Sequence, residues 1–240
     1  MERAIGTCKW AWCIGLTIFW ASLGILTWPL SPSGRLYLVY ARIWSRMILW
    51  GCGIRLVADR GGPIDWNKPH VFMSSHESIF DIMALFAAIP CDVRMLAKAE
   101  LKRMPILGWS MWMAGFVFIE RRSTASARRS LEDGAAAVRN GKSIVVFPEG
   151  TRSTDGQLLE FKKGGFLLAI RAGVPVVPIA IRGSREILPK HTLLPHAGTI
   201  EVRFGEPIPT ADLGLDHKVE LAARTREVIR GMKGPPQLAA

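Results

Sequence analysis

The chain has 240 residues, four cysteines and a formal net charge of +11, with 31 Lys and Arg residues against 20 Asp and Glu. This length suits one domain with a sizeable core and argues against a second full domain, while the scattered cysteines exclude a disulfide framework and a paired metal-ligand motif. So basic a chain is expected to meet an anionic partner, and its nine Trp residues favour a membrane surface over nucleic acid.

The N-terminal part is predicted to attach the chain to a membrane. No charged residue occurs in 10–34, and the apolar run 10–30 is long enough for a membrane-inserted helix. In the next helical segment Arg35, Arg42 and Arg46 fall within about 20° of one direction, and most other positions are apolar. This arginine stripe favours a helix at the level of the lipid headgroups. A spanning helix followed by an amphipathic helix, and a cleaved signal peptide, are the alternatives.

The remainder alternates short β-rich runs with helical stretches. The predicted strands are 54–58, 71–74, 93–97, 116–119, 144–147, 174–181 and 199–204, and the predicted helices are 78–89, 100–113, 125–140, 165–172 and 218–232. Pro105 should perturb the second of these helices. We therefore predict an α/β fold whose mixed, largely buried sheet is flanked by helices. The expected division is a membrane-associated two-helix segment at 1–52, the α/β domain at 53–233 and a flexible tail at 234–240.

His76 and Asp81 form the first candidate site. On one continuous helix, residues five apart point about 140° away from each other, so the pair would not meet. They meet if His76 lies in the turn after strand 71–74 and Asp81 in the first turn of the next helix, with Ser78 as N-cap. The carboxylate would then fix one imidazole tautomer and leave the other nitrogen to accept a proton from a hydroxyl. The competing interpretation is a capping box from Ser78 to Asp81, with His76 a solvated loop residue.

Basic residues follow several of the predicted strands. Lys98, Arg121 and Arg152 each come after a strand expected near His76, and together they could bind a phosphate dianion through charge-assisted hydrogen bonds. Taken singly, each could be a solvated charge at a strand end, and Arg152 could pair with Glu149.

Four segments resemble, in order and spacing, the motif blocks of the glycerolipid acyltransferase family, above all the bacterial 1-acyl-glycerol-3-phosphate acyltransferases. The segments are His76–Asp81, Gly115–Arg121, Phe147–Arg152 and Val174–Ile181. The resemblance extends from about residue 54 to residue 205, and the predicted membrane hairpin is also similar to that of the family. Ser75 stands where the family often has Asn, and Arg122 duplicates the arginine of the second block.

The resemblance implies that His76 is a general base, oriented by Asp81, which deprotonates the free sn-2 hydroxyl of 1-acyl-glycerol 3-phosphate (lysophosphatidic acid). The oxygen would attack an acyl thioester directly, giving phosphatidic acid. Acyl-CoA or acyl-carrier protein is then a co-substrate, and neither a metal nor a resident cofactor is expected. The substrate phosphate is expected at Lys98, Arg121, Glu149, Gly150, Thr151 and Arg152. The acyl pocket is expected at Gly115, Phe118, Val174, Pro175 and Pro178.

The expected partners are lysophosphatidic acid, an anionic membrane surface and the acyl donor, with no nucleic acid. The expected location is the membrane, on the cytoplasmic face of a bacterial inner membrane. Two alternatives remain at this point. One is an acyltransferase acting on glycerol 3-phosphate, a lysophospholipid or a lyso-ornithine lipid. The other is a non-catalytic basic membrane-binding protein, which would have no need of His76 and Asp81 together with residues 149–152.

Overall fold

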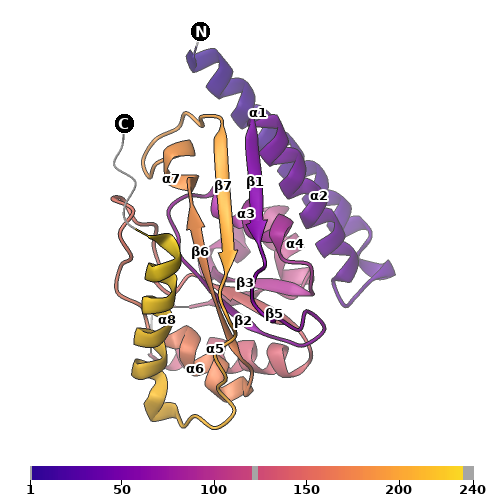
Figure 1. Ribbon diagram of the computed structural model, residues 1–240. Coiled ribbons are helices and arrows are strands. Elements are labelled where there is room, and N and C mark those ends of the chain that lie inside the picture. The colour runs from indigo at the N-terminus through magenta and orange to yellow at the C-terminus, as the bar shows by residue number, and fades with distance from the viewer. Residues whose placement is uncertain (1, 121–123, 235–240) are drawn as a thin grey trace.

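A seven-stranded sheet lies at the centre of the computed structural model, which describes residues 2–120 and 124–234 (Figure 1). The strand order is β1-β7-β6-β2-β5-β3-β4. The strands are β1 (Ile54–Asp59), β2 (Val71–Ser74), β3 (Val93–Lys98), β4 (Val117–Ile119), β5 (Ser143–Val146), β6 (Val176–Arg182) and β7 (Gly198–Phe204). Neighbouring strands are parallel except β6 and β7, so the predicted mixed sheet is confirmed.

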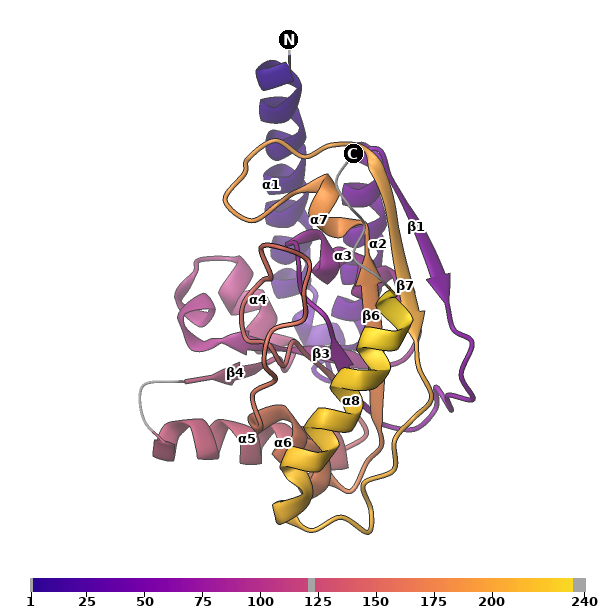
Figure 2. The same cartoon turned by 60° about the vertical axis from the view of Figure 1, so that its left-hand side comes forward.

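Helices cover both faces of the sheet (Figures 1 and 2). Side chains on a strand alternate between faces: Phe72 joins the core under α2 (Arg35–Gly51) and α3 (Phe80–Ala88), whereas Val71 and Met73 face the other way. The second face is covered by α5 (Thr124–Arg139), α6 (Gly164–Ala172) and α8 (Lys218–Lys233). The remaining helices are α1 (Glu2–Leu26), α4 (Leu107–Met113) and α7 (Ser184–Ile187). Buried on both sides, the central strands β2 and β5 are apolar except for one serine at an end of each.

Two of the predicted boundaries are corrected at prolines. The helix expected at 100–113 is interrupted: a 3₁₀ turn spans Ala99–Arg103, and α4 begins only at Leu107. Between them Pro105 lacks an N–H and Ile106 adopts a φ of 62°, which prevents one continuous helix. The strand expected from residue 174 begins at Val176, immediately after Pro175. Short helix α7 was not predicted.

The first helix has the dimensions expected of a membrane helix. Within the described residues, Ala4–Leu26 is the one stretch of helix long and apolar enough to cross a bilayer. Large apolar side chains remain exposed along it, among them Ile14, Ile18 and Phe19. Its opposite face packs on α2, and buried residues of both helices join the core of the α/β domain. In Figures 1 and 2 the N-terminal turns of α1 project beyond that domain.

The arginine stripe of α2 is only partly free for lipid headgroups. Arg42 donates hydrogen bonds to the carbonyl oxygens of Pro90 (2.8 Å) and Cys91 (2.5 Å), and the exposed Arg35 lies 3.9 Å from the Asp92 carboxylate. Two of the three arginines therefore also fasten α2 to the loop after α3. The proposed boundaries at 52 and 233 stay predictions, and residues 235–240 of the expected tail lie outside the described residues.

Candidate active site

His76 and Asp81 are in contact, as the spacing predicts. His76 lies two residues after the end of β2, and Asp81 is the second residue of α3. Nδ1 of the imidazole lies 2.8 Å from Oδ2 of the carboxylate. Asp81 is fully buried, whereas the His76 side chain is 15% exposed. An Nδ1–H donated to Asp81 leaves the lone pair on Nε2, which makes no hydrogen bond to any described residue. The exposed nitrogen is thus set up to accept a proton.

Asp81 also organises the start of α3. The same Oδ2 atom accepts the backbone N–H groups of Glu77 (2.7 Å) and Ser78 (2.9 Å). The prediction of Ser78 as N-cap is wrong: Ile79 holds that position, and the Ser78 hydroxyl donates instead to the Leu188 carbonyl at 3.0 Å. Both N–H groups lie just before the helix, so the carboxylate of its second residue holds the preceding turn against α3. One carboxylate oxygen of Asp81 therefore serves both the turn before α3 and the imidazole of His76.

Residues after β5 hold His76 from the other side. The Phe147 ring stacks on the imidazole with centroids 3.9 Å apart and planes 17° apart, and the Ser153 N–H donates to the His76 carbonyl at 2.8 Å. Glu149 is buried, and its two oxygens accept the N–H groups of His76 (3.0 Å) and Leu159 (2.9 Å). Burial raises the pKa of Glu149, and these hydrogen bonds oppose the rise. Glu149 therefore shapes the turn, and within the described part of the chain it forms no ion pair with Arg152; its expected role as a phosphate ligand stays a prediction.

Ser75 connects the turn to β6. Its hydroxyl accepts the Ile181 N–H at 2.9 Å, and its own N–H donates to the Ile179 carbonyl at 3.1 Å. The buried serine thus satisfies the backbone of the neighbouring strand at the position where the resembling family often has Asn.

The other predicted phosphate-binding residues separate into near and distant ones. Arg152 is half-buried, and its guanidinium has no partner in the described part of the chain; Thr151 beside it is exposed. Gly150 has a φ of 72°, a left-handed conformation that favours glycine in this tight turn. Lys98 is exposed at the end of β3, which β5 separates from β2, so it is farther from His76 than expected. Arg121 lies outside the described residues.

The predicted acyl-pocket residues are not gathered around His76. Pro175 accepts the N–H of Val71, the first residue of β2, whereas His76 lies beyond the last residue of that strand. A strand's two ends lie at opposite edges of the sheet, so Val174 and Pro175 are at the edge opposite to His76, and their role in an acyl pocket stays a prediction. The same edge holds Gly115, where an added Cβ would lie 2.7 Å from Nζ of Lys142, just before β5. Pro178 is buried in mid-strand beside Met73, and Phe118 is half-buried on the edge strand β4.

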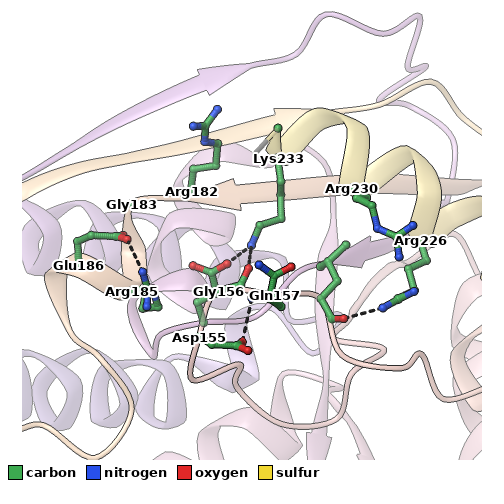
Figure 3. Close-up of a pocket in the computed structure, with 13 residues that line it drawn as sticks. Asp155, Gly156, Gln157, Arg182, Gly183, Arg185, Glu186, Arg226, Arg230 and Lys233 are labelled. Atoms are coloured by element: carbon green, nitrogen blue, oxygen red, sulfur yellow. Dashed lines mark hydrogen bonds and ion pairs between the residues drawn. The ribbon is translucent and has the colours of Figure 1, made fainter. Parts of the chain in front are cut away.

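A pocket of about 110 Å³ adjoins the segment 74–81, here called the catalytic turn, and was not predicted from the sequence (Figure 3). It lies between α8, α7 and the loop 155–158. Lys233, at the end of α8, forms an ion pair with the buried carboxylate of Glu77 and donates to the Gly156 carbonyl at 3.0 Å. Burial lowers the pKa of Lys233 to about 8. Arg226 donates to the Leu158 carbonyl at 2.7 Å. Helix α8 thus contacts Glu77, the residue next to His76, through Lys233. The two residues are 156 positions apart, so no local sequence pattern predicts this contact.

Comparison with known proteins agrees with the resemblance seen in the motifs. The family model described as Acyltransferase matches residues 57–182. The 1-acyl-sn-glycerol-3-phosphate acyltransferase alpha of Ovis aries is 33% identical over 175 residues, 72% of this chain and 61% of the relative. The 1-acyl-sn-glycerol-3-phosphate acyltransferase of Cocos nucifera is 31% identical over 213 residues, 85% of this chain and 68% of the relative. This chain thus spans about three fifths of the length of the sheep protein.

The fold has a counterpart among solved structures. The crystal structure of the 1-acyl-sn-glycerophosphate (LPA) acyltransferase PlsC from Thermotoga maritima superimposes with a TM-score of 0.76 and 22% sequence identity, covering 98% of this chain and 97% of that one. The two-helix segment is included in this coverage. Together, the matched residues 57–182, with the contact between His76 and Asp81 inside them, show that the chain belongs to the acyltransferase family.

Proposed function

We propose that this protein transfers an acyl chain from an acyl thioester to the sn-2 hydroxyl of lysophosphatidic acid, producing phosphatidic acid. The observation that carries the proposal is the 2.8 Å contact between His76 Nδ1 and the buried Asp81, at the carboxyl edge of the sheet, which leaves Nε2 without a hydrogen-bond partner among the described residues. The names of the relatives in sheep and coconut support lysophosphatidic acid as the acceptor.

In the proposed mechanism Nε2 of His76 accepts the hydroxyl proton while the acceptor oxygen attacks the thioester carbonyl carbon. The carbon–sulfur bond then breaks, and the imidazolium returns the proton to the leaving thiolate. A positioned base supplies about 10²- to 10⁴-fold of rate. The remaining acceleration must come from holding both substrates together and stabilising the oxyanion. Because a thioester is already activated, the reaction requires neither a covalent enzyme intermediate nor a resident cofactor.

We place this reaction at a membrane, on the cytoplasmic face of a bacterial inner membrane, with acyl-CoA or acyl-carrier protein as the donor. Support comes from α1, whose exposed Ile14, Ile18 and Phe19 suit lipid better than water. The sequence net charge of +11 favours an anionic lipid surface.

The decisive assay uses the purified full-length protein in detergent with labelled acyl-CoA or acyl-carrier protein. The acceptors are lysophosphatidic acid, glycerol 3-phosphate, a neutral lysophospholipid and lyso-ornithine lipid. We expect the highest kcat/KM with lysophosphatidic acid. A higher value with another acceptor would reassign the substrate, and no transfer to any acceptor from either donor would reject the catalytic proposal.

A further inference from the structure

The loop 188–196, between α7 and β7, connects the catalytic turn to the membrane helix. At its start the Leu188 carbonyl accepts the Ser78 hydroxyl. Farther along, the Leu193 carbonyl accepts the Trp10 indole N–H at 2.5 Å, and the Pro195 carbonyl accepts Lys9 Nζ at 2.9 Å. Figure 2 shows this loop, in orange, reaching across to α1. The loop is therefore held by the catalytic turn at its start and by α1 farther along.

Lys190 extends from this loop to the segment that contains Arg152. Its ammonium donates to the Thr151 hydroxyl at 3.3 Å and to the Arg152 carbonyl at 3.2 Å. Both acceptors are neutral, and Lys190 forms no ion pair with a carboxylate of residues 2–120 or 124–234. An ammonium has three protons, so it retains capacity for another acceptor. Lys190 thus contacts the backbone of Arg152, and neither side chain of these two residues, here called the cation pair, has a carboxylate partner in the described structure.

The sheet order places the cation pair next to His76. Strand β2, which leads to His76, lies between β5 and β6. Arg152 is on the loop after β5, and Lys190 is on the connection after β6. The residue after Arg152, Ser153, donates its N–H to the His76 carbonyl at 2.8 Å. Lys98, by contrast, ends β3 on the far side of β5.

The chemistry of the acceptor requires cations close to the base. In lysophosphatidic acid only four covalent bonds separate the reacting sn-2 oxygen from phosphorus, so a hydroxyl held at Nε2 brings the phosphate to the loops around His76. We propose that Lys190 binds the acceptor phosphate together with Arg152, an assignment that rests on the proposed function. Two cations that have no carboxylate partner in the described residues suit a dianion, since charge-assisted hydrogen bonds to phosphate are the stronger kind. Because the loop is bonded to α1, the phosphate is held between the catalytic turn and the membrane helix.

Kinetics of Lys190→Met test the assignment. The full-length variant, in detergent, should show a KM for lysophosphatidic acid raised about tenfold or more, as expected for one lost charge-assisted contact. The KM for acyl-CoA should stay near that of the wild type. Lys190→Arg, which retains the charge, should recover most of the loss. The control is Lys218→Met, because Lys218 also donates to a backbone carbonyl, that of Leu215 at 3.2 Å, but at the start of α8; its kinetics should be unchanged.

A binding measurement separates this proposal from the proposed function. Glycerol 3-phosphate carries the phosphate without the acyl chain, and a ligand that binds the native state raises Tm. It should raise the Tm of the wild type and Lys218→Met, but raise that of Lys190→Met much less, and glycerol should have no effect on any of them. Failed transfer to lysophosphatidic acid with this pattern intact would reject the function alone. Equal responses of wild type and Lys190→Met to glycerol 3-phosphate, or equal acceptor KM values, would overturn the role of Lys190.

Discussion

The catalytic turn, residues 74–81, and the cation pair share the carboxyl edge of the sheet, but their polar groups have different partners. In the turn, Asp81 accepts three hydrogen bonds on one oxygen, and Glu149 accepts the N–H of His76 from outside. In the cation pair, the Arg152 guanidinium has no partner among the described residues, and the Lys190 ammonium contacts only neutral oxygens.

The difference follows from what each region must do. A general base works only if its proton-accepting nitrogen is oriented before the substrate arrives, so the protein itself must supply the orienting contacts. A cation binds an anionic substrate at a smaller cost in free energy when it does not first have to break an ion pair with a carboxylate of the protein. Disturbing the turn should therefore lower kcat, whereas disturbing the cation pair should raise the acceptor KM.

The largest expected effect is at the base. His76→Ala should lower kcat by about 10²- to 10⁴-fold, because the proton acceptor is lost. Asp81→Asn should be nearly as damaging, since the amide cannot hold the imidazole and the turn with one charged oxygen. Circular-dichroism melts close to wild type alongside the lost turnover would show that the chemistry, rather than the fold, is affected. Retention of a tenth of wild-type kcat by His76→Ala would exclude it as the base.

Lys233→Met removes the cation that pairs with Glu77 and should therefore disturb the catalytic turn. It leaves the Glu77 carboxylate buried without its cation, so kcat should fall, because Glu77 is the neighbour of His76 in the chain. Steady-state kinetics in detergent would measure the loss. The double variant with Glu77→Gln should recover most of it, because no buried charge is then unpaired. If kcat falls by a larger factor than either KM changes, the effect lies in the catalytic turn rather than in substrate binding.

The pH dependence of this ion pair has opposite signs for stability and activity. The pKa of Lys233 is about 8 in the folded protein and near its ordinary value of 10.5 when unfolded. Between these values the unfolded chain binds more protons, so the free energy of unfolding should rise with pH. Over the same range Lys233 loses the charge that holds Glu77, and kcat should fall. In Lys233→Met, both the rise of the free energy of unfolding with pH and the fall of kcat with pH should become smaller. If both pH dependences are as large as in the wild type, groups other than Lys233 cause them.

Arg152→Ala tests the other half of the comparison. Losing one charge-assisted phosphate contact should cost about 1.5–3 kcal/mol, a ten- to hundredfold drop in kcat/KM for lysophosphatidic acid. The acyl-donor KM should hardly change, and Arg152→Lys should recover only part of the loss because a point charge replaces a planar fork. Steady-state kinetics with each substrate varied in turn give the answer. Equal losses for both substrates would assign Arg152 to structure.

Lys98→Ala should have the smallest effect. Its strand is separated from β2 by β5, and its side chain is exposed, so the change should alter the acceptor KM by less than about twofold, the usual range for a surface charge. The same kinetic assay serves. If Lys98→Ala lowers kcat/KM for lysophosphatidic acid as much as Arg152→Ala does, the phosphate site extends toward β3.

Much of this arrangement follows from the sequence because it depends on local patterns. Alternating apolar runs and turn residues located the seven strands to within a few residues, and the spacing of His76 and Asp81 predicted their contact. Local rules also indicated the break near Pro105. The family resemblance required only that the motif blocks occur in order along the chain.

The tertiary structure decided which strands became neighbours. An apolar run specifies a strand, but its partners depend on how distant segments pack, and β2 pairs with β5 and β6, both more than 60 residues farther along. Chain order therefore pointed to Lys98, whereas sheet order places Lys190 beside Arg152, and the fold of α8 brings Lys233 to Glu77. The sequence by itself predicted the contact between His76 and Asp81, because the two residues are only five positions apart. Only the packed sheet determined the charges around them, because those contacts join residues far apart in the chain.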